Sequence, residues 1–86
     1  MDKKIIKIVK RYIEAVPENY KLKRAYLFGS YAKGKATSDS DIDIALVLDT
    51  KRNLFDTTID LMKIRRDIDL RIELHPFHAK DFQSSA

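Results

Sequence analysis

Two aspartates separated by one residue are the part of this sequence whose chemistry is easiest to identify. Asp41 and Asp43 alternate with Ile42 and Ile44. Residues two apart on a strand project from the same face, roughly 7 Å apart along it. Carboxylate oxygens are the ligands that divalent cations such as Mg²⁺ prefer. The spacing therefore predicts that both aspartates bind one cluster of metal ions.

A glycine-serine pair at the end of a short apolar run is separated from the first aspartate by ten residues. A turn made by Gly29 and Ser30 after a strand would let backbone N–H groups and the serine hydroxyl approach a phosphate closely. Gly34 can end a short helical turn, and either Lys33 or Lys35 could neutralise phosphate charge. We therefore expect a triphosphate to be bound by Gly29, Ser30, Lys33 and Gly34.

A third carboxylate is useful in such a site, because two metal ions must grip the attacking and leaving oxygens of a transferring phosphoryl or nucleotidyl group. Strict alternation over 68–74 predicts a half-buried strand that ends at Pro76. Asp69, between two aliphatic residues, is our choice for the third metal ligand and catalytic base. Glu73 on the same face is the main rival, and Asp69 could instead pair with Arg71 on an exposed strand face.

Several helices and strands must position these residues. Helical spacing over 2–16 predicts an amphipathic helix with Asp2 as its N-cap and Pro17 as its stop, followed by a polar connector over 17–23. Apolar runs over 25–28 and 42–48 predict two buried strands. Asn53 can cap a second helix that runs to about residue 66. Its expected buried stripe is Leu54, Phe55, Ile59, Leu61 and Met62.

The expected fold class is α/β (α+β), a small mixed β-sheet of about three to four strands with helices packed on one face. We expect the 86 residues to form a single domain, 1–86, with a modest core. His75 and His78 surround Pro76 and are expected to be exposed loop residues rather than metal ligands. The segment from His78 onward could begin a helix or a strand, with a frayed end at 83–86.

Composition excludes several function classes. No apolar run is long enough for a membrane span, and the charged start lacks a signal-peptide core, so a cytoplasmic location without a membrane partner is expected. The absence of cysteine removes disulfides and thiolate metal sites. The net charge of +4 arises from basic residues spread along the chain, so a nucleic-acid partner is not expected.

The combined pattern resembles the DNA-polymerase-β nucleotidyltransferase superfamily, in which a Gly-Ser turn precedes an Asp-x-Asp strand and a third acid follows on a later strand. Among its branches, chain size and the segment 69–77 resemble the minimal nucleotidyltransferases, which are often encoded beside HEPN-domain partners as antitoxins. The resemblance covers roughly residues 25–82. The matching positions are Gly29, Ser30, Gly34, Ser40, Asp41, Ile42, Asp43 and Asp69.

The resemblance implies an Mg²⁺-dependent nucleotidyltransferase that moves AMP from ATP to a hydroxyl on a partner protein, such as a HEPN-type toxin. It implies metal ligands at Asp41, Asp43 and Asp69. Larger members carry a further helical domain, so the resemblance is also compatible with a homo- or hetero-oligomer. The alternative is a non-catalytic antitoxin or binding module that acts by contact with its partner.

Overall fold

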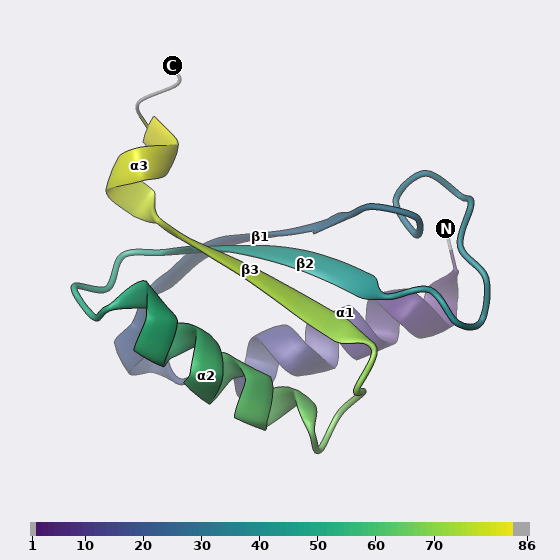
Figure 1. The fold of residues 1–86 in the computed structure, drawn as a ribbon, viewed down its shortest axis with the longest axis horizontal. Helices are drawn as coiled ribbons and strands as arrows, with labels where there is room; N and C mark the ends of the chain where they lie inside the picture. The colour runs from purple at the N-terminus through teal and green to yellow at the C-terminus, as the bar shows by residue number, and fades with distance from the viewer. Residues whose placement is uncertain (1, 84–86) are drawn as a thin grey trace.

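The computed structural model describes residues 2–83, which form a three-stranded sheet with two helices against one face (Figure 1). The expected α+β class and mixed sheet are confirmed. None of the helices in the described part of the chain has an apolar stretch that could cross a membrane. In chain order the elements are α1 (Lys3–Ala15), the 3₁₀ helix η1 (Glu18–Tyr20), β1 (Leu22–Phe28), β2 (Ile42–Leu48), α2 (Leu54–Arg65), β3 (Ile72–His78) and α3 (Ala79–Gln83).

Strand β2 is the centre of the sheet. It pairs antiparallel with β1 and parallel with β3, so the strand order is β1-β2-β3. Every residue of β2 except Asp43 is buried. The sequence Ile-Asp-Ile-Ala-Leu-Val-Leu explains this, because a central strand is covered by neighbours and Asp43 is its one charged residue. A single carboxylate is therefore held on the central, buried strand of the sheet.

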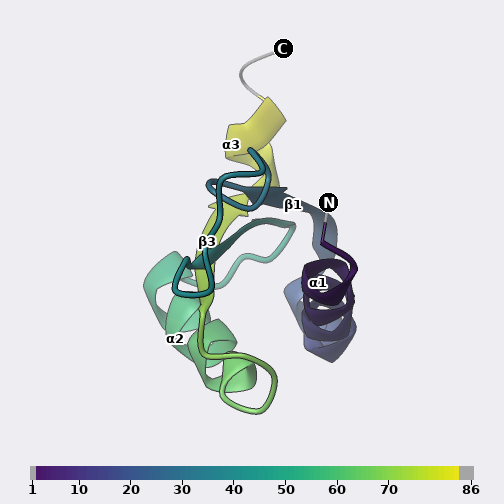
Figure 2. The same ribbon diagram turned by 90° about the vertical axis from the view of Figure 1, so that its right-hand side faces the viewer.

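Helices α1 and α2 lie side by side beneath the same face of the sheet (Figure 2). Together with the sheet they enclose the core, and the opposite face of the sheet is left without a covering helix (Figure 1). Burying these aliphatic and aromatic side chains supplies the main driving force for folding. The core consists of Ile5, Tyr12, Val16, Tyr20, Ile42, Ile44, Leu46, Leu48, Leu61, Ile72 and Leu74.

Both predicted helix caps are confirmed. The Asp2 carboxylate accepts a hydrogen bond from the Lys4 N–H at 2.8 Å, and the Asn53 side chain accepts from the N–H groups of Phe55 at 2.7 Å and Asp56 at 3.3 Å. These acceptors satisfy N–H groups that a first helical turn cannot satisfy internally. The predicted strand over 42–48 also has the expected bounds.

Two strand boundaries differ from the sequence prediction. Strand β1 begins at Leu22, within the expected polar connector, and contains an irregularity between Leu22 and Arg24. Strand β3 spans Ile72–His78, so the expected strand over 68–74 begins four residues too early and Pro76 does not end it. An edge strand tolerates proline, because its outer N–H groups need no partner in the sheet. The segment from His78 onward continues as α3, and the expected fraying at 84–86 lies outside the described residues.

The buried face of α2 also differs from the prediction. Leu61 is buried as expected, but Phe55, Ile59 and Met62 are exposed. The inward side is instead formed by Thr57 and Leu61, together with the partly buried Ile64. Both sets have the spacing i, i+4, i+7, so both form a stripe along one side of a helix. Periodicity alone could not decide which stripe faces the sheet.

A buried hydrogen bond between the two helices yields a stability prediction. The Tyr12 hydroxyl is fully buried and donates to the Leu61 carbonyl at 2.8 Å, and burial raises the pKa of this hydroxyl. Tyr12→Phe should lower the free energy of unfolding by about 1 kcal/mol, measured by urea denaturation. Tyr26→Phe is the control, since the exposed Tyr26 hydroxyl lies 3.4 Å from Arg24. An equal loss in both variants would contradict the assignment.

Candidate active site

Asp43 lies on the face of the sheet that α1 and α2 leave uncovered. Its pairing partners are Phe28 on β1 and Glu73 on β3. Directly paired residues in a sheet share a face, so the three side chains form one row across the strands. The Asp43 side chain is 24% exposed and that of Glu73 is 52% exposed. A ligand above the sheet can therefore reach both carboxylates.

Gly29 follows Phe28 and lies directly against the Asp43 carboxylate. Its φ of +74° falls in the left-handed region, and a Cβ built on it would collide with Asp43 Oδ2. Only glycine combines this backbone conformation with so close an approach. The Gly-Ser turn and the Asp-x-Asp strand, separated by ten residues in sequence, are thus in contact in space.

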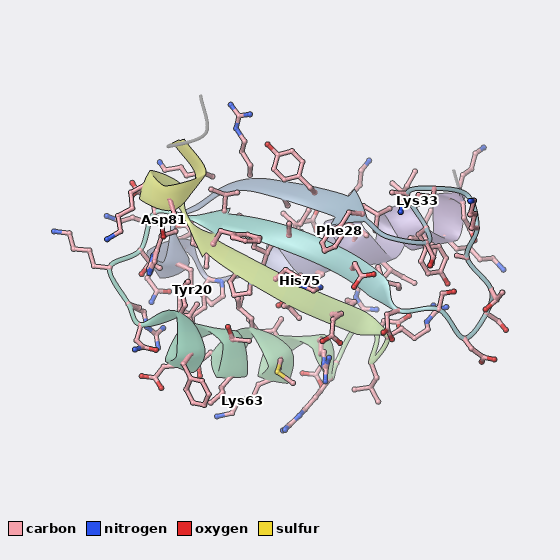
Figure 3. All side chains as sticks on the ribbon, turned by 45° about the horizontal axis from the view of Figure 1, so that its top comes forward. Tyr20, Phe28, Lys33, Lys63, His75 and Asp81 are labelled. Atoms are coloured by element: carbon pink, nitrogen blue, oxygen red, sulfur yellow. The ribbon has the colours of Figure 1, made fainter. Side chains whose placement is uncertain are left out.

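The turn after Gly29 is a single helical turn that ends in a Schellman motif. The Lys35 N–H donates to the Ser30 carbonyl at 2.9 Å and the Gly34 N–H to the Tyr31 carbonyl at 3.4 Å. Gly34 has φ +70°, the left-handed conformation that this motif requires. The expected short helix is a hydrogen-bonded turn over residues 29–34 and not a regular helix, and Gly34 ends it as predicted. Ser30 is exposed on it, and so is Lys33 (Figure 3).

His75 is a site residue that the sequence prediction missed. It lies within β3, and its Nε2 is 3.2 Å from Asp43 Oδ1. An ionised carboxylate can only accept, so the imidazole N–H is the donor. The His75 ring also packs edge-on against Phe28, with centroids 4.8 Å apart (Figure 3). If the alternating pattern of the strand is continued by two residues beyond Glu73, His75 falls on the same face as Glu73. The sequence signal that could have identified His75 was therefore this alternation.

Asp69 precedes β3 instead of lying on it, which corrects its predicted position. Arg71 binds both of its oxygens, Nε to Oδ1 at 3.0 Å and Nη2 to Oδ2 at 2.8 Å. This pairing holds the pKa of the Asp69 carboxyl below its usual range. Arg71 also donates to the Tyr31 hydroxyl at 3.1 Å. Asp69 and Arg71 therefore connect the loop before β3 to the turn that follows Gly29.

Asp41 lies one residue before β2 and is exposed. Alternation places it on the same side of the chain as Asp43. Among residues 2–83, no three His, Asp or Glu side chains are already gathered as a metal cage. Mg²⁺ is usually bound by one or two carboxylates, with water and substrate phosphate completing its shell. The oxygen donors Asp41, Asp43 and Glu73 beside an open turn fit this requirement.

The chain is similar in sequence to a known protein family over almost its whole length. A family model described as "Polymerase beta, Nucleotidyltransferase" matches residues 3–85. Three relatives in Methanocaldococcus jannaschii are named as proposed protein adenylyltransferases. One is 44% identical over 57 residues, covering 64% of this chain and 54% of the relative. Another is 42% identical over 45 residues, covering 52% and 45%. The third is 45% identical over 40 residues, covering 46% of each.

The matched region spans about half the length of each of these relatives. No solved structure gives a significant match to the chain.

The two glycines provide a matched pair of variants. Both have positive φ, but an added Cβ meets Asp43 at Gly29 and no atom within 4 Å at Gly34. Gly34→Ala should lower the free energy of unfolding by about 1 kcal/mol because of backbone strain alone. Gly29→Ala should cost about 2 kcal/mol or more, since strain and collision add. It should also shift the His75 ring signals in NMR spectra, whereas Gly34→Ala should leave them unchanged. Equal losses of stability in Gly29→Ala and Gly34→Ala would contradict the close approach of Gly29 to Asp43.

The Asp69–Arg71 pair predicts a pH-dependent contribution to stability. The pKa of Asp69 is lowered in the folded protein. The pair therefore stabilises the fold above the unfolded carboxyl pKa of about 3.9, and this contribution is lost as pH falls through the folded pKa. Asp69→Asn should lower the free energy of unfolding near neutral pH by about 1 kcal/mol.

The difference between Asp69→Asn and the wild type should disappear in acid, measured by denaturation at several pH values. Asp67→Asn, at an exposed neighbouring position, is the control and should have little effect at any pH. If the difference in free energy of unfolding between Asp69→Asn and the wild type grew in acid, the predicted direction of the pH dependence would be wrong.

Proposed function

Since this chain belongs to the polymerase beta nucleotidyltransferase family, we propose that it transfers AMP from ATP to a hydroxyl group of a partner protein. The observation that carries the proposal is the contact between the Gly29 turn and the Asp43 carboxylate. It places a glycine-serine turn suited to phosphate binding beside carboxylates suited to Mg²⁺.

In the proposed reaction, an acceptor hydroxyl oxygen forms a bond to the α-phosphorus of ATP. The bond between the α-phosphorus and the bridging oxygen breaks, and pyrophosphate leaves with the electron pair. The hydroxyl proton passes to a carboxylate of the site. Such transfers depend chiefly on positioning and on stabilisation of developing charge. The partly exposed Asp43 carboxylate on the central strand meets the first requirement, because the strands on both sides fix its position.

Asp41 and Asp43 would hold Mg²⁺, which when bound neutralises phosphate charge. Gly29 and Ser30 would hold the triphosphate through backbone N–H groups and the serine hydroxyl, with Lys33 and Gly34 on the same turn. His75 would fix the orientation of the Asp43 carboxylate through its contact with Oδ1. The opposite oxygen, Oδ2, then stays toward the Gly29 turn, where the phosphates would lie.

Glu73 is the third carboxylate in this proposal, in place of the Asp69 expected from sequence. It pairs with Asp43 across β2 and β3, and its nearest cation is Arg65 at 3.9 Å. Asp69 has both carboxylate oxygens bound by Arg71 and lies before the strand. Releasing it would break three hydrogen bonds. Glu73 also keeps the hydrophobic-acid-hydrophobic pattern, between Ile72 and Leu74.

A protein acceptor is favoured by the names of the M. jannaschii relatives. The resemblance to minimal nucleotidyltransferases adds that the acceptor is a HEPN-type toxin and that the chain acts as its antitoxin in the cytoplasm. The second candidate function is a non-catalytic antitoxin that acts by contact alone. The accessible row of Asp43 and Glu73 favours catalysis, because a contact surface has no need of adjacent carboxylates.

The function is tested by incubating the chain with Mg²⁺, ATP and the product of the neighbouring gene. Label at the α-phosphate should become attached to the partner, while label at the γ-phosphate should not. Asp43→Asn should reduce transfer at least about a hundredfold, because a metal ligand is lost. Label from the γ-phosphate on the partner, or transfer that survives Asp43→Asn, would sink the proposal.

Glu73→Gln and Asp69→Asn distinguish the two candidates for the third carboxylate. Glu73→Gln should abolish transfer and weaken Mn²⁺ binding, followed by the electron paramagnetic resonance of free Mn²⁺, while leaving the free energy of unfolding unchanged. Asp69→Asn should retain Mn²⁺ binding. The reverse pattern would restore Asp69 to the metal site.

A further inference from the structure

The solvent-facing side of α2 carries an apolar stripe, which we call the outer stripe, formed by Phe55, Ile59 and Met62. These residues are 73%, 40% and 39% exposed. Their spacing of i, i+4, i+7 aligns them along one side of the helix. The opposite side of α2 packs on the sheet through Thr57 and Leu61. Helix α2 is therefore apolar on two sides, and only one of them is buried within the described chain.

Helix α1 in the same layer shows that this arrangement is specific to α2. The outer side of α1 is charged and solvated, with exposed lysines at positions 3, 4, 7 and 10. A surface helix ordinarily has one apolar stripe, which faces the core, and a polar outer side, as α1 does. Aligned exposed apolar side chains rimmed by charge are instead typical of an interaction site. The outer side of α1 is therefore charged, whereas the outer side of α2 is apolar.

The charges beside the outer stripe indicate the partner. Asp56 and Lys63 are both exposed, seven residues apart, on one edge of the stripe. Lys63 points away from the sheet (Figure 3). The other edge carries Thr58 and Arg65, whose guanidinium is bound to the Ile72 carbonyl at 2.7 Å. One edge therefore has an acid near the start of the helix and a base near its end.

We propose that the outer stripe binds the outer stripe of a second copy of this chain, with the two α2 helices antiparallel across a two-fold axis. In an antiparallel helix pair, like edges face each other, so Asp56 of each copy lies opposite Lys63 of the other. A parallel pair would place the Asp56 edge against the Thr58 and Arg65 edge and lose this complementarity. Charges that flank an apolar stripe set the orientation of paired helices in this way. The two-fold axis produces the Asp56–Lys63 pair twice.

The Asp43 face is unaffected by this arrangement. Asp43 alternates with Ile42 and Ile44, which are buried in the core, so it lies on the face of the sheet opposite to α1 and α2, which pack on the other face (Figures 1 and 2). Two copies joined through α2 therefore present two such faces pointing away from the interface. The inference depends only on α2 and holds whether or not the chain is a nucleotidyltransferase.

The test is the mass in solution, measured by size-exclusion chromatography with light scattering as the protein is diluted. The wild type should have twice the mass of one 10.0 kDa chain. Asp56→Lys and Lys63→Glu should each weaken the dimer about tenfold or more, because like charges then face each other twice. An equimolar mixture of the two variants should dimerise again, since each copy then complements the other.

A second pair of variants controls for misfolding. Phe55→Ser should yield a monomer with the circular dichroism of the wild type, whereas Leu70→Ser should remain dimeric. Leu70 is also exposed, at 69%, but lies in the loop before β3 and not on α2. A wild type that is monomeric at every concentration, a mixture that fails to dimerise, or dimers that survive Phe55→Ser would each overturn the proposal. A monomer that binds a different protein through this stripe would overturn it as well.

Discussion

The approach of the Asp43 carboxylate to the backbone of Gly29 is the constraint on which the rest of the site depends. It requires a glycine with positive φ immediately after β1 and an aspartate opposite it on β2. The antiparallel pairing of the two strands supplies this juxtaposition, because Phe28 and Asp43 are partners in the register. A shift of that register by one residue would turn Asp43 into the core and Ile44 toward solvent.

The buried side of β2 fixes this register. Ile42, Ile44, Leu46 and Leu48 are fully buried against α1 and α2, so slippage would expose four aliphatic side chains at a cost of roughly 2 kcal/mol each. The hydrophobic core thereby holds the carboxylate at a defined place on the opposite face. The site and the core lie on opposite faces of one strand. A substitution that disturbs the packing of the core should therefore also displace the Asp43 carboxylate.

Two further contacts hold the Asp43 carboxylate and the loops beside it in place. His75 binds one oxygen of Asp43 from the neighbouring strand, and Arg71 connects Asp69 to Tyr31 in the turn after Gly29. The first contact orients a carboxylate and the second anchors a loop. A long loop between β1 and β2 has few apolar side chains to hold it, so such polar anchors determine its position.

The sequence by itself determined the elements with local signals. Asp2 and Asn53 mark helix starts because their side chains cap free N–H groups, Gly34 ends a turn because it adopts positive φ, and the apolar run of β2 predicts a covered strand. The family pattern of Gly29, Ser30, Asp41 and Asp43 was readable for the same reason, since its spacing is local.

The tertiary structure alone decided what depends on packing between distant segments. Alternation over 68–74 left open whether Asp69 pairs with Arg71 and whether Asp69 or Glu73 lies near Asp43. Strand pairing selects the register, and it places Glu73 and His75 beside Asp43 and leaves Asp69 before the strand, bound by Arg71. Two stripes of equal spacing on α2 were likewise indistinguishable until one of them packed on the sheet. Periodicity specifies a face, and only contact with the rest of the fold specifies which way that face points.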